Sequence, residues 1–269
     1  MINFFKNKVV AVTGGSDGIG KALVEKLIFE GAFVSTCGRN HDKLLSLEKH
    51  IQSVNLFVFN ADVSIKEDCK DFIHHTINKF GKIDILINNA GISMRSMLID
   101  CDIDVIKKLM DINFLGAVYC TKYALKSIMQ NKGSIVGISS IAGYRGLPGR
   151  SGYSASKFAL NGWLESIRTE LSPLDVNVMW VCPGFTKSNI RNAALNENAV
   201  AQGESPLNEN SLMSAEECAS RILIAIQKKK RTLVLTFQGK ETIWLNKFFP
   251  RLTDILIRKF FFKNGILIK

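Results

Sequence analysis

Short apolar segments rich in β-branched residues alternate with longer helical segments along most of the chain, and this alternation limits the possible folds more than any other feature. The predicted strands cover Val9 to Thr13, Phe33 to Thr36, Leu56 to Phe59, Ile83 to Ile87, Ser134 to Ile138, Asn177 to Val181 and Leu233 to Phe237. The predicted helices cover Ile19 to Glu30, His41 to Ile51, Ile65 to Phe80, Ile103 to Met129, Tyr153 to Leu171 and Ala215 to Gln227. This order predicts an α/β fold with a doubly wound parallel sheet of about seven strands and helices on both faces.

The length of 269 residues and the hydrophobic content of 46% fit one domain with a substantial core. We expect this domain to span residues 1–240 and a basic amphipathic extension to span residues 241–269. From Lys187 to Met213, Asn, Glu, Ala and Gly replace the periodic pattern, which is typical of a lid over a substrate site or of disorder. Ser214, followed three residues later by Glu217, predicts a capping box at the start of the next helix.

The six cysteines and four histidines are scattered, without a C-x-x-C pair or a metal-ligand spacing. We therefore predict reduced thiols and no metal site. The first eight residues lack the apolar run and the small-residue cleavage site of a signal peptide. No uninterrupted apolar run approaches the roughly 18 residues that a membrane-spanning helix needs. The expected location is the cytoplasm.

A glycine-rich turn from Thr13 to Gly20 follows the first predicted strand and opens a helix. Glycines let the backbone approach a pyrophosphate closely, and the helix N-terminus offers N–H groups to it. The turn therefore predicts a dinucleotide site, with a purely structural turn as the alternative. The cofactor contacts expected in it are Gly14, Ser16, Asp17, Gly18, Ile19 and Gly20.

The end of the second strand indicates which dinucleotide binds. The segment from Ser35 to Asn40 contains no acid that could hold a ribose 2′-hydroxyl, whereas Arg39 can pair with a 2′-phosphate. This favours NADP over NAD, although NAD remains an alternative. An arginine after a strand is often simply solvated, and Asp17 would repel the phosphate from the same side.

Tyr153 and Lys157 lie four residues apart at the start of a predicted helix, so their side chains share a face. A tyrosine with a pKa near 10 is a poor acid or base at neutral pH, and an adjacent ammonium would favour its phenolate. The spacing alone is common by chance. It gains weight from the Asn88 to Gly91 segment after the fourth strand, from Asn113, and from Ser140 after the fifth strand. The carboxyl ends of parallel strands share one sheet edge, so these groups can face one crevice.

From about Lys8 to Thr236, the chain resembles a short-chain dehydrogenase/reductase of the single-domain, Rossmann-type subgroup. The resemblance is carried by TGxxxGIG at Thr13 to Gly20, Asp62-Val63, NNAG at Asn88 to Gly91, Asn113, Ser140, YxxxK at Tyr153 to Lys157, and Pro183-Gly184. It implies that Tyr153 gives or takes the proton, that Lys157 lowers the pKa of Tyr153 and binds the nicotinamide ribose, and that Ser140 orients the substrate oxygen. It further implies that Asn113 supports a water in a proton relay through Lys157.

The same resemblance implies further cofactor contacts. Asp62 and Val63 would flank the adenine, and Asn89, next to Ala90 and Gly91, would flank the adjacent ribose. The nicotinamide contacts would be Pro183, Gly184, Thr186 and Ser188. Ser188 stands where the family usually has threonine, and Thr186 stands where an apolar residue is common. Asp17 is the larger departure, because many NADPH-using relatives carry a basic residue there.

Basic residues concentrate at the end of the chain. Eleven Lys and Arg residues and only two acidic residues lie in 228–269, so +9 of the net charge of +11 belongs to this segment. From Ile243 to Phe260, apolar residues recur at three- and four-residue steps opposite a basic face, which is typical of a helix at a membrane interface. Pro250 should bend or split this helix. The alternative is that the helix packs on its own domain or on a second subunit; nucleic acid is unlikely, because no recognised binding fold accompanies the charge.

The combined prediction is an NADP(H)-dependent oxidoreductase that interconverts a carbonyl and an alcohol, in the direction of reducing a hydrophobic ketone. The tail resembles that of membrane-associated relatives acting on lipids or steroids, and Gly31 to Leu45 is similar to 3-ketodihydrosphingosine reductases. The alternatives are a catalytically idle Rossmann-fold protein that binds membrane or nucleic acid through its tail, and an NAD-dependent alcohol dehydrogenase. Relatives usually pair through the long helices near 103–129 and 153–171, so we expect a homodimer or homotetramer.

Overall fold

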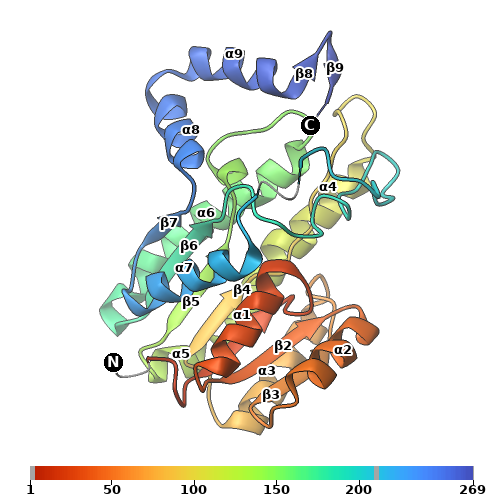
Figure 1. Cartoon of the computed structure of the whole chain (residues 1–269). Helices are drawn as coiled ribbons and strands as arrows, with labels where there is room; N and C mark the ends of the chain where they lie inside the picture. The colour runs from red at the N-terminus through yellow and green to blue at the C-terminus, as the bar shows by residue number, and fades with distance from the viewer. Residues whose placement is uncertain (1–3, 209–211, 269) are drawn as a thin grey trace.

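The central feature of the computed structural model, which describes residues 4–208 and 212–268, is a sheet of seven parallel strands (Figure 1). Its strands are β1 (Val9–Thr13), β2 (Phe33–Gly38), β3 (Leu56–Asn60), β4 (Ile85–Asn88), β5 (Ser134–Ile138), β6 (Asn177–Cys182) and β7 (Thr232–Val234). Their order is β3-β2-β1-β4-β5-β6-β7, so the direction of winding reverses between β1 and β4. The predicted doubly wound parallel sheet is confirmed, and ligands of such sheets bind where the order reverses.

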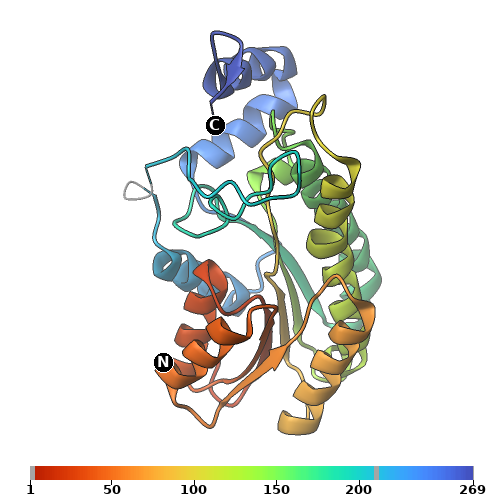
Figure 2. The ribbon, with the colours of Figure 1, turned by 90° about the vertical axis from the view of Figure 1, so that its right-hand side faces the viewer.

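Helices cover both faces of the sheet (Figure 2). One face carries α1 (Gly18–Phe29), α2 (His41–Ile51) and α7 (Ala215–Gln227), and the other carries α3 (Lys66–Phe80), α5 (Gly116–Gln130) and α6 (Ser151–Leu171). Successive residues of β1 point to opposite faces, with Val10 and Val12 in the first core and Ala11 in the second. Every residue of β1, β4 and β5 is buried, which explains their unbroken apolar sequences.

The long helix predicted from Ile103 to Met129 is interrupted in the structure. It consists of α4 (Ile103–Met110), a π-helical turn (Asp111–Leu115) and α5. The buried Asn113 lies in the π-helical turn. Its side-chain oxygen accepts a hydrogen bond from the Ile92 amide, and its side-chain amide donates one to the Ile92 carbonyl. The prediction of a helix over this range is confirmed, because the backbone stays helical through the π-helical turn. The turn itself was not predicted, since the contacts of Asn113 come from a distant part of the chain.

The C-terminal extension stands at the carboxyl end of the sheet, above the rest of the molecule in Figure 1. It contains α8 (Phe237–Phe248), α9 (Pro250–Phe261) and a hairpin of β8 (Phe262–Lys263) with β9 (Ile266–Leu267). The predicted break at Pro250 is confirmed, because Pro250 opens α9. The predicted last strand was too long at its end, since Thr236 already caps α8 by accepting a hydrogen bond from the Gly239 amide (3.1 Å).

The segment predicted as a lid, 187–213, lies over the carboxyl end of the sheet, and its residues 209–211 fall outside the described residues. Isolated bridges tie it to the body, pairing Leu195 with Met94 and Met213 with Thr186. The serine half of the predicted capping box is confirmed, because the Ser214 hydroxyl accepts a hydrogen bond from the Glu217 amide (3.0 Å). The Glu217 carboxylate pairs with Arg221 (2.6 Å). Within residues 4–208 and 212–268, no helix combines the length and the apolar character needed to span a bilayer.

Candidate active site

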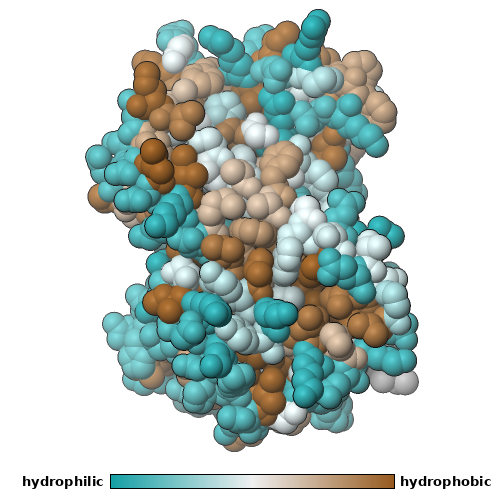
Figure 3. All heavy atoms as spheres, turned by 180° about the vertical axis from the view of Figure 1, so that it is seen from behind, coloured by the Kyte–Doolittle hydropathy of each residue, from teal (hydrophilic) through white to brown (hydrophobic). Residues whose placement is uncertain are grey.

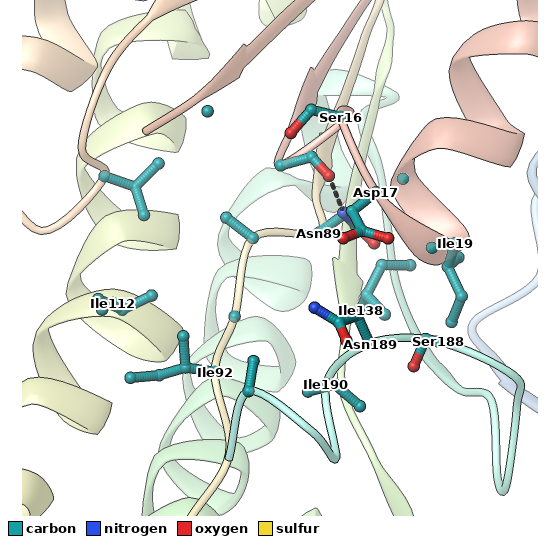
Figure 4. Close-up of a pocket in the computed structure, with 18 of the residues that line it drawn as sticks. Ser16, Asp17, Ile19, Asn89, Ile92, Ile112, Ile138, Ser188, Asn189 and Ile190 are labelled. Carbon is teal, nitrogen blue, oxygen red and sulfur yellow. Dashed lines mark hydrogen bonds between the residues drawn. The ribbon is translucent and has the colours of Figure 1, made fainter. Parts of the chain in front are cut away.

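A cavity of about 410 Å³ opens at the carboxyl ends of the central strands, where the strand order reverses (Figure 4). Most of the predicted site residues line it. They are Gly14, Ser16, Asp17, Gly18, Ile19, Gly20, Arg39, Val63, Asn89, Ala90, Gly91, Ser140, Tyr153, Lys157, Pro183, Gly184, Thr186 and Ser188. Asp62 and Asn113 lie outside the lining: Asp62 pairs with Arg39 (3.5 Å), and Asn113 is buried beneath the site.

The glycine-rich turn forms one wall of this cavity. Gly14 has a φ of 70°, in the left-handed region, and a Cβ on Gly20 would lie 2.1 Å from the Gly14 carbonyl oxygen, so the turn excludes side chains at both positions. The Asn89 side chain, seen beside the turn in Figure 4, donates hydrogen bonds to the carbonyls of Thr13 (2.9 Å) and Gly14 (3.0 Å). The turn therefore leaves bare backbone toward the cavity, which fits a dinucleotide pyrophosphate.

The N-terminus of α1 faces the same cavity. Its first residues are supplied by the glycine turn, and the N-cap residue, Asp17, makes no side-chain capping hydrogen bond. The Asp17 carboxylate instead forms an ion pair with Lys43 of α2. Because the side chain does not cap the helix, its first N–H groups and the positive end of its dipole are left for an anion in the cavity.

Two ion pairs lie at the end of the cavity formed by β2 and α2. Arg39 and Lys43 both line the cavity, and each has an acidic partner, Asp62 and Asp17 respectively. All four side chains are partly exposed. Sequence reasoning missed Lys43. The sequence does contain a signal for it: Asp17 lies in the glycine turn, and a lysine lies in the first turn of the helix after β2. Both positions are at the same sheet edge, so an ion pair between them could have been predicted.

Ser140, Tyr153 and Lys157 come together at the opposite end of the cavity from Arg39, carried by the end of β5 and by α6. Ser140 follows β5, and its hydroxyl accepts a hydrogen bond from the Ala142 amide (3.1 Å). The Lys157 ammonium lies 5.8 Å from the centre of the Tyr153 ring and donates a hydrogen bond to the Ile138 carbonyl (2.9 Å). The predicted spacing thus places the phenol, the ammonium and the serine hydroxyl around one space.

Burial governs the acid–base properties of this group. Burial raises the pKa of Tyr153 above its usual value, while a hydrogen bond with Ser140 and the charge of Arg150 act in the lowering direction. Burial also lowers the pKa of Lys157 to about 8. The groups that act to lower the pKa of Tyr153 in this structure include Ser140, Arg150 and Arg191.

Asn113 supports the site from behind. Its side-chain amide donates to the Ile92 carbonyl (2.9 Å) and to the Ser156 hydroxyl (2.9 Å), and its oxygen accepts from the Ile92 amide (2.8 Å). Ser156 precedes Lys157 on α6, so Asn113 links the loop after β4 to α6. All these side-chain hydrogen bonds are internal, which indicates a positioning role for this side chain.

A second cavity, of about 380 Å³, adjoins the first. The two share Ser140, Tyr153, Gly184, Ile190 and Arg191. The far wall of the second cavity comes from the C-terminal extension and is largely apolar, with Leu245, Leu256, Ile257, Phe260 and Phe261. Hydrogen bonds of Asn246 with Arg145 (2.9 Å) and with the Tyr144 carbonyl (3.1 Å) hold the extension to its own domain, which was one of the interpretations of the amphipathic tail. Sequence reasoning did not predict that the tail would form a wall beside Tyr153.

A seven-stranded parallel sheet with a glycine turn and a Ser-Tyr-Lys group at its carboxyl edge defines the class of protein, and sequence comparison agrees. The chain belongs to the short chain dehydrogenase family, whose sequence model matches residues 8–199. It is therefore an NAD(P)-dependent oxidoreductase that acts on carbonyl and alcohol groups, as predicted.

Individual relatives extend the match beyond the family segment. A Dictyostelium discoideum protein named dehydrogenase/reductase SDR family protein 7-like is 33% identical over 95% of this chain and 82% of its own length. An Arabidopsis thaliana protein named 11-beta-hydroxysteroid dehydrogenase-like 4A is also 33% identical, over 91% of this chain and 82% of its own length. Among solved structures, a Burkholderia phymatum short chain dehydrogenase/reductase in complex with NAD has a TM-score of 0.82 at 20% identity, covering 94% of this chain and 96% of that one. This last match shows a shared fold.

Proposed function

We propose that the protein is an NADPH-dependent reductase of hydrophobic ketones. The observation that carries this proposal is the position of Ser140 and Tyr153 in the wall shared by the two cavities. A dinucleotide bound along the glycine turn would reach this wall from one side, and an apolar substrate would reach it from the other. NADPH supplies the hydride when bound, and the chain supplies the proton and the orientation of the carbonyl.

Tyr153 is the proton donor in this proposal. Its raised pKa keeps the phenol protonated at neutral pH, which suits the reduction of a carbonyl better than the oxidation of an alcohol. The Ser140 hydroxyl holds the carbonyl oxygen beside the phenol, and Lys157 holds the nicotinamide ribose. Asn113 fixes the helix that carries both Tyr153 and Lys157.

Three features support NADPH over NADH. The end of β2, from Cys37 to Asn40, carries no acid that would bind ribose hydroxyls. Arg39 lines the cavity at this end, where a 2′-phosphate would lie. Lys43 neutralises Asp17, the acid that would otherwise repel that phosphate. The remaining predicted cofactor contacts, Asp62 and Val63 at the adenine and the segment Pro183 to Ser188 at the nicotinamide, complete the proposed site.

The substrate class follows from the second cavity. Its apolar wall, formed by α8 and α9, suits a hydrocarbon body, and a volume of about 380 Å³ is of the size that holds a small organic ligand. The Arabidopsis relative is named as steroid dehydrogenase-like, which supports a hydrophobic carbonyl compound here as well. The steroid, lipid and 3-oxoacyl classes all meet these requirements.

The outer face of the extension supports peripheral contact with a membrane surface. Large apolar side chains on α8 and α9, including Trp244, Phe248 and Ile255, are more than half exposed. Lys240, Lys247, Arg251, Arg258, Lys259 and Lys263 lie on the same extension. Figure 3 shows apolar side chains interrupting the hydrophilic surface in the part of the molecule where the extension lies. Aromatic groups beside cations are typical of interfacial helices.

Replacement of the proposed proton donor tests the reaction. Tyr153→Phe should lower kcat/KM for NADPH-dependent ketone reduction by about 10²- to 10⁴-fold, the contribution typical of a general acid. NADPH binding, followed by nucleotide fluorescence, should remain. Tyr123→Phe removes a hydroxyl from α5, outside both cavities, and serves as the matched control. Full activity of Tyr153→Phe would refute the assigned role.

A further inference from the structure

Arg150 is a cationic side chain in the substrate cavity that the reaction itself does not use. It is the N-cap residue of α6 and precedes Tyr153 by three residues. It lines the second cavity together with Tyr153 and the apolar residues of α8 and α9. Residues three apart at the start of a helix are neighbours on its surface, and both of these residues line the same cavity.

The guanidinium of Arg150 has no acidic partner in the part of the chain that the structure describes, because no carboxylate there lies within 4.0 Å of it and its side chain donates no hydrogen bond to a described residue. The guanidinium lies over the ring of Phe261, whose centre is 5.4 Å from Cζ. Burial lowers the pKa of Arg150 to about 10, and the charges of Arg95 and Arg191 act in the same direction. A largely buried cation among like charges is costly unless an anion pairs with it.

The neighbouring arginines are held by other groups. Arg95 pairs with Glu204 (3.0 Å) and donates to the side-chain oxygen of Gln202 (2.9 Å). Arg191 donates to the Thr186 carbonyl (2.8 Å). The carboxylate of Glu241 lines the same cavity from α8, but it forms no ion pair with Arg150. Arg150 is therefore the cation whose donors remain for a ligand in the cavity.

The Phe261 ring lies on one side of the guanidinium, with its centre 5.4 Å from Cζ. An aromatic ring attracts the cation but leaves the hydrogen-bonding capacity of most of its N–H groups to other partners. Two such N–H groups match the spacing of carboxylate and phosphate oxygens and bind them through two parallel hydrogen bonds. An anionic group of the ligand can thus meet Arg150 while its hydrocarbon part lies against Leu245 and Leu256.

We propose that Arg150 forms an anion subsite and that the substrate is a hydrophobic ketone carrying a carboxylate or a phosphate within a few bonds of the reacting carbonyl. The closeness of Arg150 to Tyr153 sets the short separation between the two groups of the substrate. This inference rests on the proposed reductase function, because the carbonyl is placed by the assignment of Tyr153 as proton donor. The anion subsite specifies the polar group of the substrate, whereas the apolar wall of the cavity specifies only its hydrocarbon part.

Matched substrates test the subsite by turnover. The rates of NADPH oxidation are compared for 4-oxodecanoate, its methyl ester, and a keto-alkyl phosphate of the same chain length. The wild-type protein should prefer an anionic ketone over the ester by at least 10-fold in kcat/KM. Arg150→Met, which keeps an apolar stem of similar length, should lower kcat/KM for the preferred anion by about 10- to 150-fold, the factor that a charged hydrogen bond contributes, and should change the ester by less than 3-fold.

The two anionic substrates identify the group. A preference for the carboxylate or for the phosphate names the head group, and the absence of any preference over the ester would overturn the proposal. A loss for Arg150→Met that is equal on anion and ester would overturn it as well, because it would mean that Arg150 acts on Tyr153 or on the fold. Arg221→Met is the matched control, since Arg221 lies on α7, outside the cavity, and pairs with Glu217.

A binding measurement separates this proposal from the proposed function. Calorimetric titration with decanoate, decyl phosphate and methyl decanoate needs no turnover. If no ketone is reduced but one of the anions binds the wild-type protein at least 10-fold more tightly than the ester and loses this advantage in Arg150→Met, the reductase function fails and the anion subsite stands. If neither anion binds more tightly than the ester, the subsite is refuted whatever the activity.

Discussion

At the scale of single residues, two ion pairs determine the charge beside the proposed ribose position. Asp17 is paired with Lys43, and Asp62 is paired with Arg39. The negative charge of Asp17 in the glycine turn is therefore balanced by a lysine. Both pairs are partly exposed, and such pairs contribute only about 0 to 1 kcal/mol to stability. A 2′-phosphate can therefore draw Arg39 and Lys43 away from their carboxylates at little cost.

This competition gives a prediction for cofactor choice. Arg39→Ala should weaken NADPH binding by about 10-fold or more and leave NADH binding nearly unchanged, because a charged hydrogen bond contributes about 1.5 to 3 kcal/mol. Asp17→Asn should strengthen NADPH binding, since it frees Lys43. Dissociation constants from fluorescence titration check both. Lys21→Ala, which breaks an ion pair with Glu25 on α1, is the control, and an unchanged NADPH preference in Arg39→Ala would remove Arg39 from its assigned role.

The raised pKa of Tyr153 predicts opposite pH profiles for the two directions of the reaction. Reduction uses the protonated phenol, so its kcat/KM should stay level through neutral pH and fall only as the pH rises through the pKa of Tyr153. Oxidation uses the phenolate, so its kcat/KM should rise with pH throughout the range below that pKa, in which the reduction rate stays level. Rates of both reactions from pH 6 to 10 test this expectation; an oxidation rate that falls with rising pH would contradict it.

At the scale of elements, the helix between β4 and β5 shows what periodicity predicts and what it misses. The apolar pattern from Ile103 to Met129 continues without a break, because α4 and α5 both bury one face against the body. The π-helical turn at Asp111–Leu115 coincides with the hydrogen bonds from Asn113 to Ile92 and Ser156, which join distant segments. The apolar periodicity of a segment does not depend on contacts with distant residues, so it cannot predict them. The helix break at Pro250 was predicted correctly, because proline acts on its own backbone.

The extension should bind anionic membranes through its outer face. The wild-type protein is expected to sediment with vesicles that contain phosphatidylserine and to be released by salt, because basic residues and exposed aromatic side chains act together. The double variant Trp244→Ser and Phe248→Ser should bind several-fold less. Val54→Ser, which removes an exposed apolar group near β3, should bind as the wild type does. Failure of the wild-type protein to bind such vesicles would refute membrane contact.

At the scale of the whole molecule, the parallel sheet and the glycine turn at its edge were predictable because the alternation of strands and helices, the turn and the Tyr153-to-Lys157 spacing are each visible in short segments. The positions of Lys43, Arg150 and the extension were not, because they depend on how separate elements meet. Arg150 stands only three residues from Tyr153, yet its significance depends on Phe261 and on the cavity that α9 closes. The surroundings of Arg150 therefore cannot be read from the sequence next to it.

A dimer formed through the α4 and α6 surface is the expected assembly. Phe158 on α6 and Ile103 on α4 are exposed large apolar residues, and burial of such groups stabilises association. Phe158→Glu should convert the dimer or tetramer to a smaller species in sedimentation velocity experiments. Phe29→Glu, at an exposed position on α1, should not alter the assembly. A wild-type protein that sediments as a monomer at micromolar concentration would refute this expectation.

The close contact between Gly184 and Thr236 has a consequence for how such enzymes diversify. A Cβ on Gly184 would lie 2.5 Å from the Thr236 side chain, so the segment proposed to contact the nicotinamide lies directly against the N-cap residue of α8. We expect that the chain beyond Thr236 can be exchanged while Ser140, Tyr153 and Lys157 keep their positions, because β5 and α6 carry these three residues. A chimaera that joins residues up to Thr236 of this chain to the extension of a relative should therefore keep the reductase reaction. It should accept the substrates of the relative that supplied the extension, so the C-terminal extension would act as an exchangeable determinant of substrate specificity.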